Sequence, residues 1–134
     1  MLQKKMDIEV RLVPHRNWRV HEEDLLDNVD ERTRVLAVSQ VSFYTGQNLN
    51  LKKISDNIKN STTLFALDST HASGALNVSA DLTDLCVSSS YKRLLATHGV
   101  APCYLSEKPK IGFDQPVSVG ITFKFGLHRE LSGS

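Results

Sequence analysis

Two residues near the middle of the chain, Asp68 and Lys92, could carry chemistry because each closely follows a short apolar run. Asp68 comes directly after the run at 64–67, and Lys92 follows the run at 85–87 and a cluster of serines. Short apolar runs bounded by polar residues are typical of buried strands. In an open α/β sheet, ligands bind beyond the carboxyl ends of the strands. We therefore expect both side chains at one ligand crevice.

The two side chains suit one kind of chemistry when taken together. A lysine amine can attack a carbonyl carbon and form an imine. A carboxylate can hold a proton on the ring nitrogen of a ligand by charge pairing. A pyridoxal phosphate site needs both groups, because its protonated ring works as an electron sink. Taken singly, Lys92 would be read as a solvated lysine and Asp68 as a cap or turn residue, so the hypothesis depends on the pair.

Five segments in the first half of the chain alternate between strand and helix patterns. Strands are predicted at 8–13, 35–38 and 64–67, and helices at 22–29 and 51–59. The first strand alternates apolar and charged residues, which suits a strand with one solvated face near a sheet edge. The second is almost uniformly apolar, as expected for an interior parallel strand covered on both faces. This alternation predicts an α/β fold with right-handed crossovers.

The helix at 51–59 has the clearest local signals. Asn50 precedes it as an N-cap residue, and three apolar residues recur on one of its faces, namely Leu51, Ile54 and Ile58. We expect that face to pack on the sheet.

Three further strands are predicted in the second half of the chain, at 85–87, 100–105 and 121–125. Pro102 interrupts the second of them and cannot donate a ladder hydrogen bond, so this strand is expected near an edge. The last strand has no evident partner or covering helix, and the end of the chain at 121–134 is poorly determined by its sequence.

Composition narrows the classes of function. The chain has 134 residues, 40% hydrophobic and 23% charged, which suits one globular domain. Its net charge of +1, with basic and acidic residues interleaved, makes nucleic acid an unfavourable partner. Its apolar stretches fall short of the roughly 20 residues of a membrane span, and no apolar signal core follows Met1, so a cytoplasmic chain is expected. Cys86 and Cys103 lack metal-ligand spacing; free thiols are favoured over a disulfide.

Three short motifs resemble the class V aminotransferase family of pyridoxal-phosphate enzymes, which includes cysteine desulfurases, kynureninases and isopenicillin N epimerase-like proteins. They are DSTH at 68–71, SSYK at 89–92 and THGV at 97–100. Upstream segments fit in the same order, namely 8–14, 30–33 and VSFYTG at 41–46. The resemblance covers roughly residues 7–120.

The resemblance implies a fold and a set of roles. It implies a partial, mostly parallel sheet with flanking helices, similar to the centre of the large domain of fold-type I pyridoxal-phosphate enzymes. Lys92 would be the Schiff-base lysine, Asp68 the partner of the pyridine nitrogen, and His71 a neighbour of the cofactor's 3-oxygen. Ser89 and Tyr91 would hold the phosphate, since hydroxyl groups donate hydrogen bonds to phosphate oxygens.

The resemblance also implies a function and its limits. Members of the family act on amino acids as homodimers, and they carry a phosphate loop before this region and a small domain after it. Residues 1–134 are therefore expected to form part of a large domain that is incomplete as a catalyst. The alternative is a non-catalytic α/β module that acts by association. A flavodoxin-like binder would need a glycine-rich loop after the first strand, where Pro14, His15 and Arg16 stand.

Two questions stay open at the level of sequence. Phe43 stands where the family often has an asparagine, so no hydrogen bond to substrate or cofactor is assigned there. Neither Arg93 nor Arg129 has a motif context that makes it a clamp for a substrate carboxylate. The substrate, and the choice among transaminase, lyase and desulfurase, are therefore left undecided.

Overall fold

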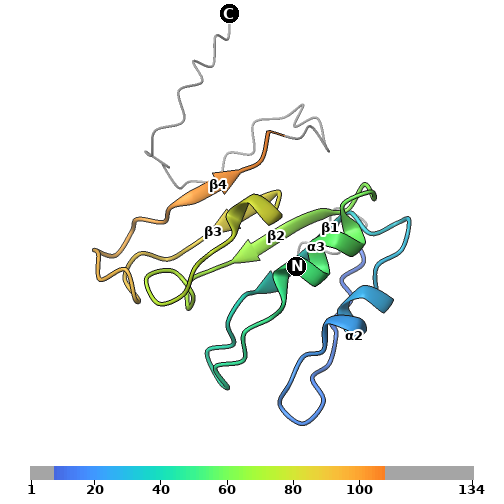
Figure 1. Ribbon diagram of the computed structural model, residues 1–134, viewed down its shortest axis with the longest axis horizontal. Coiled ribbons are helices and arrows are strands. Elements are labelled where there is room, and N and C mark those ends of the chain that lie inside the picture. Colours follow the sequence, from blue (N-terminus) through green and yellow to red (C-terminus); the bar gives the residue numbers. More distant parts are fainter. Residues whose placement is uncertain (1–7, 108–134) are drawn as a thin grey trace, which may run out of the picture.

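The computed structural model describes residues 8–107 of the chain, and four strands in this part form one sheet (Figure 1). They are β1 (Val35–Ser39), β2 (Leu64–Asp68), β3 (Leu85–Val87) and β4 (Cys103–Leu105), paired in that order. β2 runs parallel to both β1 and β3, while β4 is antiparallel to β3. The predicted α/β fold with a mostly parallel sheet is therefore confirmed.

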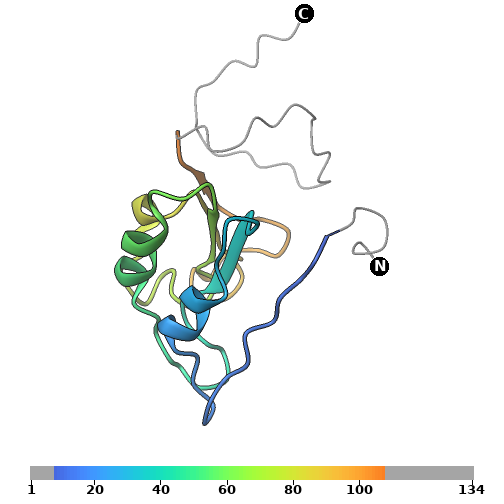
Figure 2. The same cartoon turned by 90° about the vertical axis from the view of Figure 1, so that its right-hand side faces the viewer.

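Helix α3 (Leu51–Ile58) covers one face of the sheet, which Figure 2 shows nearly edge-on. The Asn50 side chain accepts a hydrogen bond from the Lys53 N–H at 3.0 Å and caps the helix as predicted. The core between helix and sheet is formed by buried apolar side chains from both: Leu51, Ile54 and Ile58 of the helix, with Leu36, Phe65, Leu67 and Cys86 of the strands. Side chains that recur at helical spacing on one face of α3 thus pack against every second side chain of the strands.

Two short helices complete this layer. Helix α2 (Glu22–Asp27) is shorter than the predicted 22–29, and its Leu25 joins the core. A 3-10 turn, η1 (Ala80–Leu82), leads into β3 and contacts α3. No helix within residues 8–107 is long and apolar enough to cross a membrane.

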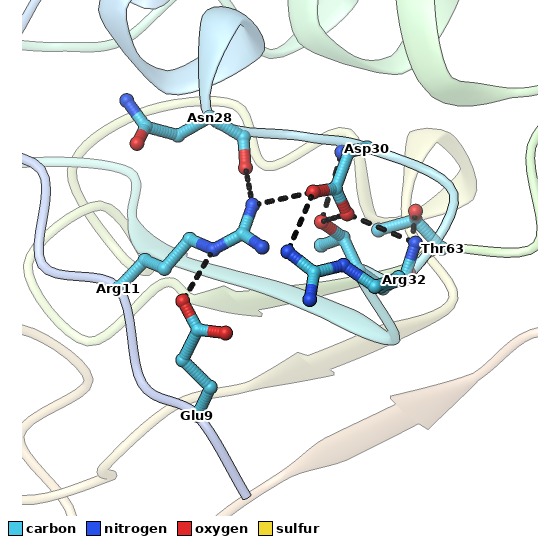
Figure 3. Close-up of polar contacts among 7 residues, drawn as sticks. Glu9, Arg11, Asn28, Asp30, Arg32 and Thr63 are labelled. Atoms are coloured by element: carbon cyan, nitrogen blue, oxygen red, sulfur yellow. Dashed lines mark hydrogen bonds and ion pairs between the residues drawn. The ribbon is translucent and has the colours of Figure 1, made fainter.

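The predicted strand at 8–13 is wrong, because this segment pairs with no strand of the described sheet. In Figure 2 it passes on the side of the sheet away from α3. Side chains hold it there (Figure 3): Arg11 binds the Asp30 carboxylate at 2.8 Å and the Asn28 carbonyl at 3.3 Å. Arg11 therefore forms an ion pair with Asp30 in the loop before β1, and Glu9 pairs with Arg11, so these charged residues do not line the solvated face of a strand.

The expectation that β1 is covered on both faces is also wrong for the described part of the chain. β1 is the end strand of the described sheet, and Val35 is 51% exposed although Leu36 beside it is buried. Only the face toward α3 is fully covered. At the other end of the sheet, β4 after Pro102 confirms the predicted edge strand, while the predicted strand at 121–125 lies outside the described residues.

The ion pair between Arg11 and Asp30 should make stability depend on pH. The hydrogen bond from Arg11 is the largest cause that lowers the pKa of Asp30 from 3.8 to about 2. Because the folded pKa is depressed, the stabilisation is complete above pH 3.8 and is lost as the pH falls toward 2. Unfolding curves of wild type and Arg11→Met should therefore differ at neutral pH and converge as the pH approaches that value. A difference independent of pH would contradict this role for the pair.

Candidate functional site

Asp68 lies at the carboxyl end of β2, between Ser39 of β1 and Val87 of β3. Because Phe65 and Leu67 point toward α3, the alternation along the strand places the Asp68 side chain on the opposite, uncovered face. The carboxylate is exposed and forms no ion pair with any residue between 8 and 107. One oxygen, Oδ1, accepts a hydrogen bond from the Thr70 N–H at 2.8 Å. The other oxygen is left to accept a proton or a donor from a ligand.

The turn after β2 is fastened to the end of β3. The Ser69 N–H donates to the Val87 carbonyl at 2.8 Å, and the Ser89 N–H donates to the Thr70 hydroxyl at 3.0 Å. Thr70 thus bonds to Asp68 through its backbone and to Ser89 through its side chain. Two of the predicted site residues, Asp68 and Ser89, are brought together by this one residue.

His71 lies one turn beyond Asp68 and is half-buried. Its ring stacks on that of Phe43, with centroids 6.1 Å apart and planes inclined by 30°. Both rings, together with Asp68, lie at one end of a groove of about 1150 Å³ that runs between β1 and residues 8–13. The predicted acid and the predicted histidine therefore open onto a common space.

Tyr91 and Lys92 lie on the exposed loop that follows β3. The Tyr91 ring stacks on His98 with centroids 4.3 Å apart, and the Lys92 Nζ atom lies 5.0 Å from the centre of the same ring. A cation over an aromatic face is weakly attracted to it. Within the described residues Lys92 has no ion pair, and no hydrogen bond joins it to Asp68. Lys92 therefore contacts its own loop and has no carboxylate partner among residues 8–107.

The ends of this loop are fixed by Ser90, which is only 3% exposed. Its hydroxyl lies 2.9 Å from the Thr97 carbonyl and 2.6 Å from the Val100 carbonyl, and its own carbonyl accepts the Ala96 N–H at 3.1 Å. Ser90 therefore closes the loop at its base while the residues from 91 onward stay exposed to solvent.

Two polar residues at the same edge of the sheet were not singled out from the sequence. Gln40 and Ser88 are each 4% exposed, and the Gln40 Oε1 and Ser88 Oγ atoms have no hydrogen-bond partner among the described residues. Each directly follows a strand, which is the positional signal that identified Asp68. Buried polar atoms are nearly always paired, so these two mark an edge that can still receive a ligand or water.

Several solved structures have a fold similar to that of this chain. The solved structures that match include an apo cysteine desulfurase from Thermococcus onnurineus NA1, with 17% identity, a TM-score of 0.69, and coverage of 79% of this chain and 27% of that one. A SepCysS–SepCysE N-terminal domain complex matches with 18% identity, a TM-score of 0.66, and coverage of 78% and 32%. DndA from Streptomyces lividans matches with 19% identity, a TM-score of 0.62, and coverage of 74% and 28%.

This chain therefore spans about a third or less of the length of those structures. None of the curated proteins compared with it gives a significant match. The model of the family described as Aminotransferase class-V matches residues 1–124, which is nearly the whole chain. The resemblance inferred from the three short motifs is thus confirmed, and the chain belongs to the class V aminotransferase family.

Proposed function

We propose that this chain forms the cofactor-holding centre of a pyridoxal-phosphate enzyme that acts on an amino acid. The observation that carries the proposal is the link through Thr70, which holds Asp68 and Ser89 together at the carboxyl edge of the sheet. Lys92 follows Ser89 by three residues and has no carboxylate partner among the described residues. When bound, pyridoxal phosphate supplies a ring that withdraws electrons from the α-carbon of the amino acid.

Asp68 is assigned to the pyridine nitrogen. Its Oδ1 atom is already bonded to the Thr70 N–H, which fixes the carboxylate, while its other oxygen is free to hold a proton on the ring. No cation within residues 8–107 competes for the carboxylate, so its charge is available to the ligand. His71, three residues on, is assigned to the 3-oxygen, to which an imidazole N–H can donate.

Ser89 and Tyr91 are assigned to the phosphate. The Ser89 N–H is occupied by Thr70, so its hydroxyl is the group left to donate. The Tyr91 hydroxyl forms no hydrogen bond with any described residue, although its ring is held against His98. Two hydroxyl donors on one loop suit the several acceptor oxygens of a phosphate.

Lys92 is assigned as the amine that attaches the cofactor. An exposed cation–π contact contributes only about 0.5–1 kcal/mol. Leaving the Tyr91 ring therefore costs Lys92 little, and no salt bridge within residues 8–107 needs to be broken. An acid with a free oxygen, two hydroxyl donors and an amine without an ion pair in the described part of the chain together fit pyridoxal phosphate.

Borohydride trapping tests this assignment directly. Pyridoxal phosphate is added to the chain, borohydride fixes the attached group, and mass spectrometry of the peptides locates it. We expect Lys92 to be labelled in preference to Lys52 in α3 and Lys59 at its C-terminal cap, which are exposed lysines paired with Asp56. Asp68→Asn should reduce the labelling of Lys92 and leave that of Lys59 unchanged. Equal labelling of all three lysines would contradict the assignment.

The whole protein is further proposed to be a cytoplasmic homodimer. The half-covered face of β1 supports association, because Val35 exposes about half of its apolar surface there. Sedimentation of the protein at several concentrations tests the dimer. A non-catalytic module acting only by association is not favoured, because the family match spans residues 1–124 and the acid and the lysine are both present.

A further inference from the structure

Five rings form a continuous series of contacts that ends at the candidate site. His15 stacks on Trp18 with centroids 5.2 Å apart, and Trp18 stacks on Tyr44 at 5.7 Å with planes inclined by only 4°. Tyr44 meets Phe43 edge to face at 5.4 Å, and Phe43 stacks on His71. We call these five residues the aromatic wall. It leads from an exposed turn near the start of the described chain to the neighbourhood of Asp68.

The turn that presents Trp18 is held in an unfavourable conformation. The backbones of Arg16 and Arg19 exchange hydrogen bonds of 2.7 and 2.9 Å around Asn17 and Trp18, whose φ angles are 50° and 63°. A left-handed backbone is unfavourable for residues other than glycine, and asparagine tolerates it better than tryptophan. The position of the Trp18 ring is therefore maintained against an opposing backbone preference.

A glutamine side chain fastens the turn to the loop that carries the other rings. Gln47 accepts the Val20 N–H through Oε1 at 2.9 Å, and its amide donates to the Val20 carbonyl at 2.5 Å. Arg16 is turned to the Asp24 carboxylate, with both guanidinium contacts at 2.9 Å. The hydrogen bonds of Gln47 thus hold the turn of Trp18 against the loop of Phe43 and Tyr44. The charge of Arg16 is neutralised by Asp24 and is not directed at the rings.

The middle of the wall is exposed. Trp18, Phe43 and Tyr44 are 63%, 76% and 72% exposed, although aromatic side chains usually contribute to a core. Phe43 and Gln47 also line the groove that contains His71 and Asp68. The exposed ring surface is therefore continuous with the groove onto which Asp68 and His71 open.

We propose that the aromatic wall binds the side chain of the amino-acid substrate, and that this side chain is aromatic. The inference rests on the proposed function, because the substrate must reach Asp68 and Lys92. Aromatic rings attract other rings through offset stacking and edge-to-face contacts. Phe43 offers neither a hydrogen-bond donor nor an acceptor, so a polar side chain gains no hydrogen bond from its ring. Small aliphatic side chains would leave the wall uncovered.

Two conjugates in which phosphopyridoxal is reductively joined to L-phenylalanine or to L-alanine test the proposal on the full chain. Trp18 is the only tryptophan, so quenching of its emission reports binding. We expect the phenylalanine conjugate to bind roughly tenfold more tightly, since one good aromatic contact approaches the 1.4 kcal/mol that corresponds to that ratio. Equal affinities would overturn the proposal.

Two variants and a matched control identify the surface responsible. Phe43→Ala and Tyr44→Ala should each reduce the preference to about twofold or less, because each removes a ring of the wall. Tyr104→Ala on β4 removes an equally polar aromatic side chain, 38% exposed, and should leave the preference unchanged. Preservation of the preference in both wall variants would overturn the proposal.

A cofactor-free measurement separates this proposal from the proposed function. In saturation-transfer NMR, free L-phenylalanine should receive magnetisation from the wild-type chain and much less from Tyr44→Ala, while L-alanine should receive little from either. If neither conjugate binds but this difference is seen, the proposed cofactor site is contradicted and the proposed role of the aromatic wall is supported. If the conjugates bind equally and no difference is seen, the proposed role of the aromatic wall is contradicted and the proposed cofactor site is supported. A concentration-dependent dimer that Tyr44→Ala abolishes would also overturn the wall, since a second copy would then cover it.

Discussion

Replacing Phe65 with alanine should lower the free energy of unfolding by roughly 3–5 kcal/mol. Phe65 is 1% exposed and packs in the core with Ile54, which is fully buried. Both of its backbone polar groups are bonded to Asp84, since the Phe65 N–H donates to the Asp84 carboxylate at 2.9 Å and the Asp84 N–H donates to the Phe65 carbonyl at 3.0 Å. A strand held in this way cannot collapse into the cavity, so the cost should fall in the upper part of that range.

Urea unfolding followed by circular dichroism measures the effect. The matched control is Val35→Ala on β1, where the side chain is 51% exposed and little apolar surface is lost. We expect the control to cost less than about 1 kcal/mol. Because Phe65→Ala can exceed the total stability of the chain, Phe65→Leu serves as the second variant and should cost about 1–2 kcal/mol. If Phe65→Leu cost no more than Val35→Ala, the core would not be centred on Phe65.

Local signals account for the parts of the fold that the sequence predicted well. Helix α3 follows from the Asn50 cap and from three apolar residues at helical spacing, all of which act within a few residues of one another. Strands β2 and β3 follow from short apolar runs that end in polar residues. None of these features needs knowledge of a distant partner.

The errors arose where the outcome depends on a distant partner. The alternation at 8–13 is compatible with a strand, but a strand also requires a neighbour for its backbone, and Arg11 binds Asp30 instead. The apolar run of β1 is compatible with burial on both faces, but only α3 covers it within the described residues. Periodicity reports what a segment can bury and does not report what lies against it.

The candidate site shows the same division. Asp68 was predicted from its place after a strand and Ser89 from the resemblance of its motif, whereas the hydrogen bond between Thr70 and Ser89 joins positions 19 residues apart and could not be inferred from either motif. The aromatic wall joins residues that lie still farther apart in the sequence. Their positions follow no regular spacing from which the ring contacts could be predicted. The roles of the site residues toward a cofactor remain predictions that the labelling experiment tests.

Gly74→Ala should be more destabilising than alanine at Gly46 or Gly99 and should disturb the loop of Lys92. Gly74 has a φ of +85°, and a Cβ atom there would lie 2.7 Å from the Arg93 carbonyl oxygen and 3.0 Å from its carbon. The positive φ alone costs about 1–2 kcal/mol for alanine. The contact adds roughly 1–3 kcal/mol, because the atoms that must move belong to the backbone and not to a flexible side chain.

Gly46→Ala separates the two contributions. Gly46 has a similar φ of +70°, but no described atom lies within 4 Å of the position that an alanine methyl group would occupy, so only the conformational cost applies. The excess cost of Gly74→Ala over Gly46→Ala in urea unfolding therefore measures the close approach of the two loops. Since Arg93 directly follows Lys92, the same displacement should lower borohydride labelling of Lys92 in Gly74→Ala and leave it unchanged in Gly46→Ala. Equal unfolding costs for the two variants would show that the turn at Gly74 does not pack on the loop that carries Lys92 and Arg93.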